Sequence, residues 1–341
     1  MPLPHSPMIQ RLGVAVSLSL ILCVSGACIR ANAQETTAET DAADRDRGIK
    51  LYQQGQIVEA IKILKRVVKT HADDADAWYF LGLAYYSNSA FLWARDALEH
   101  SVSLRPDSAD ANAKLAYALI LGNEMEQATT KARHAIELGD QSVEPHYAIA
   151  EASFRTGDYP KAIEEADQAL KIKSDFAPAL ITKSLAHYFL KQYAEAAASL
   201  EKFLAVSPND PDADVWREQL DSLRTFGQQT GGSTGSPTVS QPTEDVPLNG
   251  RDVTRRARVL DKPEPTYTEA ARKAGVNGTV VMRCVFGSDG EIRNLVVMKA
   301  LGYGLTSRAA QAARKIRFTP ATKDGKQVST WIELQYNFNL Y

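Results

Sequence analysis

The chain has 341 residues, of which 44% are hydrophobic and 23% are charged. This composition is typical of globular proteins and excludes both wholesale disorder and a protein with many membrane spans. At about 100–200 residues per domain, the length predicts two or three domains. The net charge of −2 conceals an asymmetry, because residues 34–247 carry 21 Lys or Arg and 33 Asp or Glu, whereas residues 248–341 carry 16 and 8. We therefore expect an acidic module followed by a basic one.

Residues 1–33 have the layout of a secretory signal peptide. Arg11 precedes an uncharged stretch rich in Leu and Val, Leu12 to Ile29, and an Ala-Asn-Ala site ends at Ala33. Cleavage there would remove Cys23 and Cys28 and leave Cys284 as the single remaining cysteine, so that no intramolecular disulfide could form. We predict export to the periplasm.

Two other interpretations of this segment stay open. The 18 residues from Leu12 to Ile29 could just span a hydrocarbon core of about 30 Å as an uncleaved inner-membrane anchor. Ser25 to Cys28 also resembles a bacterial lipobox, although Ser25 stands where a large aliphatic residue is usual. Membrane association is expected only if the segment is retained or lipidated.

A 34-residue period runs through residues 42–226. Its clearest marker is an alanine that recurs every 34 residues, at Ala60, Ala94, Ala128, Ala162 and Ala196. A further helical pattern precedes each alanine, and its best-formed example contains Trp78, Leu81, Gly82 and Tyr85. These features resemble the tetratricopeptide repeat, which implies helix–turn–helix units stacked into an all-α solenoid. We predict five repeats and an amphipathic capping helix from Asp214 to Phe226.

Such a solenoid has a concave face, lined by the first helix of each unit. Counting by the period, with Tyr117 added from the same face, predicts a peptide-binding groove at Tyr79, Tyr86, Tyr117, Tyr147, Phe154 and Tyr188. Some members of the repeat family bind a terminal carboxylate with Lys and Asn, but this face offers almost none, and Glu144 and Glu151 would repel a carboxylate. The expected partner is an extended segment that is apolar or basic. The alternative is that the aromatic side chains only fill space between helices.

Residues 227–247 consist mainly of Gly, Ser, Thr, Gln and Pro, which predicts a flexible linker with an end-to-end distance of roughly 25 Å. A basic cluster follows it, at Arg251, Arg255, Arg256 and Arg258. After export, an acidic protein surface is the expected partner of this cluster, and the solenoid of the same chain qualifies.

The C-terminal module has the pattern of a small α+β domain. A short helix from Thr268 to Ala274 precedes a strand from Gly278 to Phe286, and a turn leads to a second strand from Ile292 to Val297. A helix from Thr306 to Ile316 and a final strand from Gln327 to Phe338 complete it. We predict one antiparallel sheet packed against helix.

This module resembles the C-terminal domain of the TonB energy-transducer family. The matching positions are Pro265-x-Tyr267, Ala271-Arg272, Gly278, Asp289-Gly290, Ala312, Arg314 to Arg317, Phe318-x-Pro320-Ala321 and Gly325. Thr268 departs from the pattern, because a second proline is usual there. The resemblance implies a periplasmic domain whose last strand pairs with a segment of an outer-membrane receptor.

The same resemblance places a partner-binding edge at Gln327, Ser329, Trp331, Glu333 and Gln335. The alternative is that the linker or a second copy of the chain covers this edge.

The sequence predicts no catalytic residue, metal site or cofactor. No histidine has a second His or Cys at metal-binding spacing, and no phosphate-binding or dinucleotide loop follows a strand. We predict a non-enzymatic, exported cell-envelope adapter that binds proteins or peptides through both modules, and no nucleic acid. The alternative is a membrane-anchored TonB-type energy transducer that acts on outer-membrane receptors. The cleavable N-terminal segment and the solenoid, which replaces a long Pro-rich span, disfavour it.

Overall fold

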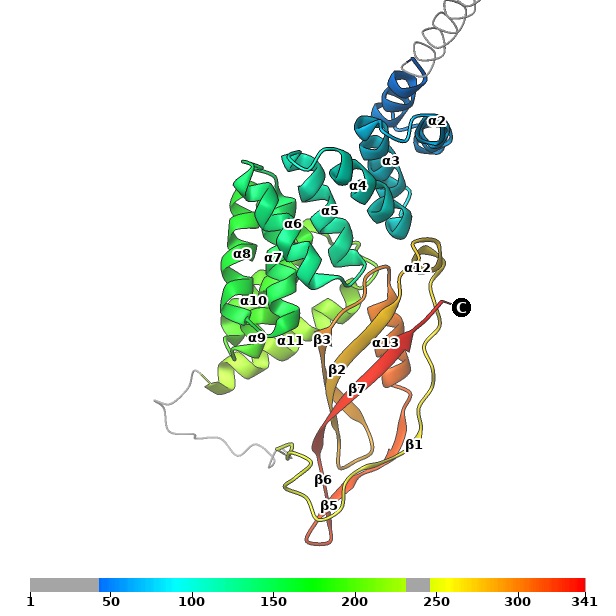
Figure 1. The fold of residues 1–341 in the computed structure, drawn as a ribbon. Coiled ribbons are helices and arrows are strands. Elements are labelled where there is room, and N and C mark those ends of the chain that lie inside the picture. The colour runs from blue at the N-terminus through cyan, green and yellow to red at the C-terminus, as the bar shows by residue number, and fades with distance from the viewer. Residues whose placement is uncertain (1–42, 231–245, 341) are drawn as a thin grey trace, which may run out of the picture.

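The computed structural model describes residues 43–230 and 246–340. The predicted signal peptide and most of the predicted linker lie outside these residues. The described chain forms a helical solenoid and a smaller module built around a sheet, which lies beside the last helices of the solenoid (Figure 1).

Paired antiparallel helices build the solenoid. Residues 43–53 are helical and pair with α2, and each later unit has two helices. The helices are α2 (Ile57–Thr70), α3 (Ala75–Ser87), α4 (Phe91–Leu104), α5 (Ala109–Leu121), α6 (Met125–Glu137), α7 (Val143–Thr156), α8 (Tyr159–Ile172), α9 (Ala177–Phe189), α10 (Tyr193–Val206) and α11 (Ala213–Thr230). The predicted repeat fold is confirmed, and α11 continues past the predicted end at Phe226.

The recurring alanines mark where the helices of one unit cross closely. They lie on α2, α4, α6, α8 and α10, and each has 0% exposure. Gly82 of α3 meets the second helix of its unit in the same way, because a Cβ atom there would lie 2.7 Å from Cγ of Leu98 and 3.3 Å from the carbonyl oxygen of Ala94. A small side chain is therefore required at this crossing.

Gly82→Ala is expected to lower the free energy of unfolding by about 1–3 kcal/mol, because Leu98 must leave a well-packed position. An exposed helical position would instead gain about 1 kcal/mol from the same change. Urea unfolding followed by circular dichroism measures the difference. Gly250→Ala is the matched control, since a Cβ atom there would have no neighbour within 4 Å. Unchanged stability of Gly82→Ala would contradict this account of the helix crossing.

The C-terminal module has two helices and seven short or medium strands within the described residues. They are β1 (Arg258–Asp261), α12 (Glu269–Lys273), β2 (Gly278–Phe286), β3 (Ile292–Lys299), α13 (Leu305–Ala313), β4 (Arg317–Thr319), β5 (Ala321–Lys323), β6 (Lys326–Val328) and β7 (Thr330–Phe338). The main sheet has the order β3-β2-β7 and is antiparallel, as predicted. Alternate residues of β2 and β7 are buried with the alanine-rich face of α13, which forms the core.

The final strand is shorter than predicted because its first residues belong to a separate hairpin strand, β6. Asp324 and Gly325 both have positive φ angles, 50° and 79°. This conformation suits the two-residue turn of a β-hairpin, and β5 pairs with β6 across it. β7 therefore begins only at Thr330.

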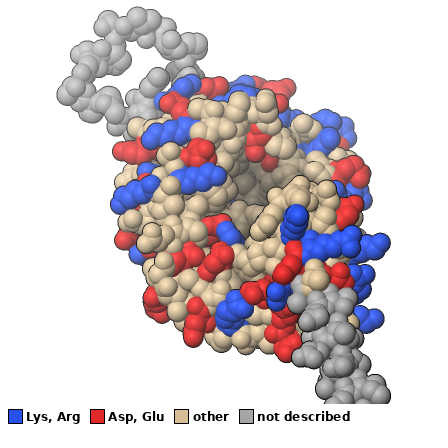
Figure 2. Space-filling view, turned by 90° about the horizontal axis from the view of Figure 1, so that it is seen from above, with Lys and Arg blue, Asp and Glu red and all other residues tan. Residues whose placement is uncertain are grey.

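The two modules share one buried core. A single cluster contains Leu200, Phe203 and Trp216 of the solenoid together with Val297 and Leu305 of the C-terminal module. The helix predicted to cap an open solenoid end, α11, thus packs against α10 on one side and contacts β3 and α13 on the other. Seen from above, the molecule is hollowed near its centre, where mostly uncharged residues face the hollow (Figure 2).

The basic cluster lies away from the contact between α11 and β3. Arg255 exchanges two backbone hydrogen bonds with Thr322 of β5, both of 2.9 Å, which places the cluster beside the β5–β6 hairpin. An ion pair between Arg314 and Glu218 joins the modules instead.

Candidate functional site

One backbone side of β7 faces away from its only partner strand in the sheet, β2. The N–H of Trp331 donates outward to the carbonyl of Leu248 at 3.0 Å, and the carbonyl of Gln335 accepts from the Lys262 ammonium at 2.7 Å. Because successive residues of a strand alternate in direction, the N–H and C=O of Glu333 lie on the same outward side. Along the described chain, no further strand pairs with this side.

Three of the predicted edge residues belong to this strand. Trp331 is half-buried, and Glu333 and Gln335 are exposed on the sheet face opposite α13. The guanidinium of Arg283 on β2 lies 4.6 Å from the centre of the Trp331 ring. The structure therefore presents the polar side chains of Glu333 and Gln335 beside the outward backbone groups of Glu333.

The other two predicted edge residues lie elsewhere, and the structure corrects their placement. Gln327 belongs to β6 and pairs with Thr322 across the hairpin. Ser329 lies between β6 and β7, is 1% exposed, and its Oγ accepts a hydrogen bond from the N–H of Ser288 at 3.0 Å. The β5–β6 hairpin takes up Gln327, and the outward carbonyl of Ser329 accepts from the N–H of Leu248 at 2.9 Å, so neither residue offers a free edge.

The opposite edge of the sheet is covered by the solenoid. The N–H of Val297 on β3 donates to Oε1 of Gln219 on α11 at 2.9 Å. Gln219 is 0% exposed, and the hydrogen bond is buried. Helix α11 thus covers the β3 edge. The β7 edge is covered at its start by Leu248, whose N–H donates to the carbonyl of Ser329 at 2.9 Å, and near Gln335 by Lys262, so within the described chain the backbone of Glu333 between them stays open.

The solenoid also caps a helix of the C-terminal module. Gly304 occupies the N-cap position of α13 and has no side chain to accept a hydrogen bond. Asp212, which immediately precedes α11, accepts from the N–H of Gly304 at 3.2 Å and from that of Ser307 at 2.6 Å. Asp212 is 3% exposed, so these bonds lie within the contact between the modules.

The loop between β3 and α13 reaches across to the second repeat. Tyr303 has a φ of 62°, in the left-handed region, and its carbonyl accepts from the hydroxyl of Thr268 at 2.7 Å. The Tyr303 ring lies 6.2 Å from the ring of Phe91, which begins α4. Thr268, the residue that departs from the TonB pattern, therefore holds this loop and also caps α12.

The predicted groove residues come from α3, α5, α7 and α9, as the repeat period requires. Neighbouring rings touch, with centroid distances of 5.6 Å for Tyr86–Tyr117 and 5.5 Å for Tyr117–Tyr147. Tyr86 is 36% exposed, whereas Tyr147, Phe154 and Tyr188 are 8–9% exposed. Tyr79 donates a hydrogen bond to Asp110.

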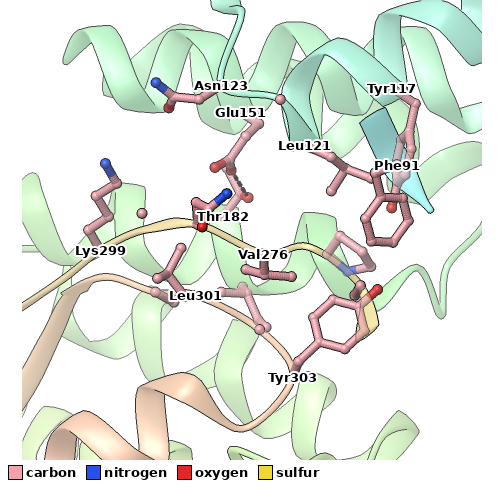
Figure 3. A pocket seen from close by; sticks show the side chains of 18 of the residues that line it. Phe91, Tyr117, Leu121, Asn123, Glu151, Thr182, Val276, Lys299, Leu301 and Tyr303 are labelled. Carbon is pink, nitrogen blue, oxygen red and sulfur yellow. Dashed lines mark hydrogen bonds between the residues drawn. The ribbon is translucent and has the colours of Figure 1, made fainter. Parts of the chain in front are cut away.

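Four of these residues line a cavity between the two modules. The cavity has a volume of about 740 Å³, within the usual range for ligand sites, and Tyr86, Tyr117, Tyr147 and Phe154 form part of its solenoid wall. The loops 274–279 and 299–303 of the C-terminal module form the opposite wall. Figure 3 shows Phe91, Tyr117, Leu121 and Tyr303 at one end and Asn123 and Lys299 at the other. Tyr79 and Tyr188 do not line this cavity.

The two predicted acidic residues of the concave face are paired. Glu144 forms an ion pair with Lys114, which holds the pKa of Glu144 below its usual value despite burial. Glu151 accepts from Nε of Arg155 at 2.7 Å and from the hydroxyl of Thr182 at 2.7 Å. The expected repulsion of a carboxylate by these two side chains is therefore offset.

Sequence reasoning missed the residues that join the modules. Asp212 and Gln219 were assigned only to the end of the solenoid, and Lys299 and Tyr303 had no assigned role. One signal was visible, because Gly302 and Gly304 flank Tyr303 and permit a tight loop. The contacts themselves link residues 78 to 95 positions apart and leave no local pattern.

Family models match three stretches of the chain. Residues 263–340 match the C-terminal domain of the Gram-negative bacterial TonB protein, and residues 48–89 and 177–210 match tetratricopeptide repeats. The chain therefore combines tetratricopeptide repeats with a TonB-type C-terminal domain. Both are interaction modules that bind proteins or peptides, and the TonB-type domain indicates a cell-envelope protein.

A curated relative, the protein TonB of Pseudomonas aeruginosa, is 29% identical over 120 residues. The match covers 34% of this chain and 34% of that protein, so the chain spans about a third of the length of this relative. Among the described residues, no helix combines the length and apolar character needed to cross a membrane.

Solved structures that are similar to this chain each cover about half of it. A crystal structure of the MamA protein is 26% identical, covers 50% of this chain and 93% of that chain, and has a TM-score of 0.43. PilW, described as a widely conserved type IV pilus biogenesis factor, is 14% identical over 57% of this chain and 87% of its own, with a TM-score of 0.46. YrrB, described as a TPR protein with an unusual peptide-binding site, is 16% identical over 49% and 86%, with a TM-score of 0.41.

Proposed function

We propose that this chain, which joins tetratricopeptide repeats to a TonB-type C-terminal domain, is an exported, non-enzymatic adapter of the bacterial cell envelope. In this function, the outer edge of β7 takes up an extended segment of a partner protein as an additional strand. A segment of an outer-membrane receptor is the kind of partner that the TonB-type domain suggests. The solenoid contributes a second binding surface on its concave face.

The observation that carries this proposal is the difference between the two edges of the sheet. The β3 edge packs against α11 and donates to Gln219, whereas the β7 edge has no packed helix and, among the described residues, leaves the backbone of Glu333 open between the contacts of Leu248 and Lys262. Added strands bind through main-chain hydrogen bonds, while alternate side chains supply specificity. Lys262, which reaches the Gln335 carbonyl, is the type of edge residue that disfavours indiscriminate pairing.

A proline at position 333 tests strand pairing without breaking the sheet. Glu333→Pro removes an N–H that points outward, so the ladder with β2 should persist and the domain should stay folded. Leu334→Pro removes an N–H that points toward β2 and should unfold the domain. A photo-crosslinking residue at Gln335, introduced in the native envelope, reports on the edge.

We expect Glu333→Pro to reduce the Gln335 crosslink to a discrete partner by about tenfold or more. Glu333→Thr, which keeps the backbone donor, should retain the crosslink. A crosslink that survives in folded Glu333→Pro would show that side chains, not the strand edge, hold the partner.

A further inference from the structure

The cavity between the modules contains a cation that no described residue neutralises. Lys299 ends β3 and is half-buried in the cavity wall, and its ammonium forms no ion pair or hydrogen bond within the described chain. Burial and the neighbouring Arg155 lower the pKa of Lys299, while Glu151 acts in the opposite direction. Glu151 is already engaged by Arg155 and Thr182. This polar group, defined as Glu151, Arg155, Thr182 and Lys299, therefore has two positive charges and one negative charge.

The polar group lies between two apolar stretches of the cavity wall. Its solenoid members come from α7 and α9. The earlier helices α3 and α5 contribute Tyr86 and Tyr117, and the later helices α10 and α11 contribute Phe203 and Trp216. Asp210 and Asp212 also line the wall beside Trp216, and both carboxylates accept backbone N–H groups within the fold. An anionic group bound at Lys299 would thus have apolar surface on both sides. This order suits an acidic side chain within a segment, with apolar neighbours before and after it.

We infer that the solenoid and the C-terminal module together form one composite binding site for a partner segment in which an acidic side chain is flanked by aromatic or aliphatic residues. The carboxylate pairs with Lys299 and Arg155, and the flanking side chains pack on the tyrosines of the solenoid and on Leu301 and Tyr303. Lys299 thereby supplies from the second module the free cation that the repeat helices lack.

This inference rests on the solenoid half of the proposed function and specifies its partner. It reverses the expectation of an apolar or basic segment, because Glu144 and Glu151 are paired within the fold. Strand pairing at β7 is a separate surface, since none of Trp331, Glu333 and Gln335 lines the cavity.

Fluorescence anisotropy with designed peptides and the purified full-length protein tests the site. The probe is acetylated, amidated Leu-Phe-Glu-Leu-Phe with a fluorescent label, and the comparison peptides carry Gln or Lys in the central position. A further peptide has Gln in the centre and a free C-terminal carboxylate. The protein variants are Lys299→Met, which removes the charge and keeps the length of the side chain, and Lys315→Met, an exposed control outside the cavity wall.

We expect the Glu peptide to bind about tenfold more tightly than the Gln peptide, as a charge-assisted contact in a partly buried site provides. Lys299→Met should abolish this preference, Lys315→Met should keep it, and Lys299→Glu should shift the preference to the Lys peptide. Equal binding of the Glu and Gln peptides would overturn the inference and leave an apolar groove. A preference confined to the free terminal carboxylate would also overturn it, in favour of chain-end recognition. If no peptide binds, the composite site is refuted, while the β7 crosslink still reports on the proposed function.

Discussion

Asp212→Ala is expected to release the C-terminal module from the solenoid. The carboxylate accepts the N–H groups of Gly304 and Ser307 at the start of α13, and no side chain of α13 can replace it because its N-cap is a glycine. Alanine would leave two buried donors unpaired, at a cost of about 1–3 kcal/mol each. The substitution therefore weakens the docking of the two modules, because the donors and the acceptor belong to different modules.

Small-angle X-ray scattering should show a larger radius of gyration for Asp212→Ala, and calorimetry should resolve two thermal transitions in place of one. Asp214→Ala is the control, since its side chain is 95% exposed and pairs only with Arg217 on the same helix. A variant that keeps the wild-type dimensions and a single transition would show that the shared core around Trp216 and Val297 suffices for docking.

The solenoid could be predicted from the sequence because each repeat carries its own information. Ala60 and its equivalents recur at a fixed spacing, and every one of them is buried at a helix crossing. The antiparallel sheet was predictable for the same reason, since the alternation along residues 278–286 is local. Repeat folds and strand patterns depend on neighbours in sequence, so the sequence alone is informative about them.

The contact between the modules depends on distant residues and could not be predicted. Helix caps are sought within a few positions of a helix, but the acceptor for α13 lies 92 residues before Gly304. The pairing of Glu144 could not be predicted for a related reason, because its partner Lys114 lies 30 residues away in the preceding repeat. Arg155, four residues after Glu151 on the same helix, was a local sign that this charge would be paired. Asp324-Gly325 was likewise a recognisable hairpin turn.

Docking of the two modules is expected to weaken as the pH rises through about 6. Burial, with a smaller contribution from Asp210, raises the pKa of Asp212 to about 6 in the docked protein, although the two N–H donors oppose the shift. In a separated solenoid the side chain is exposed, and its pKa returns toward the ordinary value of about 3.9. The docked state therefore retains its proton to a higher pH than the open state.

The direction of the pH dependence of docking follows from this difference in the pKa of Asp212. Below about pH 4 both states are protonated, and the protonated carboxyl still accepts a hydrogen bond through its carbonyl oxygen, so the docking free energy is fully present. As the pH rises toward and past 6, the docked state must hold a buried carboxylate, and the contribution is lost. The difference between a pKa of about 6 and one of about 3.9 corresponds to about 3 kcal/mol, or about a hundredfold in the docking equilibrium over the whole titration, of which about tenfold falls between pH 5 and pH 8.

Scattering profiles recorded from pH 5 to pH 8 measure this change as a growing fraction of extended molecules. Asp212→Asn is the informative control, because its amide oxygen can accept one of the two hydrogen bonds and does not titrate. Its docking should be similar to that of the mostly protonated wild type at pH 5 and insensitive to pH. Since the cavity walls come from both modules, binding of the Glu peptide should decline over the same pH range in the wild type. If the dimensions of the wild type do not change with pH, or change equally in Asp212→Asn, titration of Asp212 does not control docking.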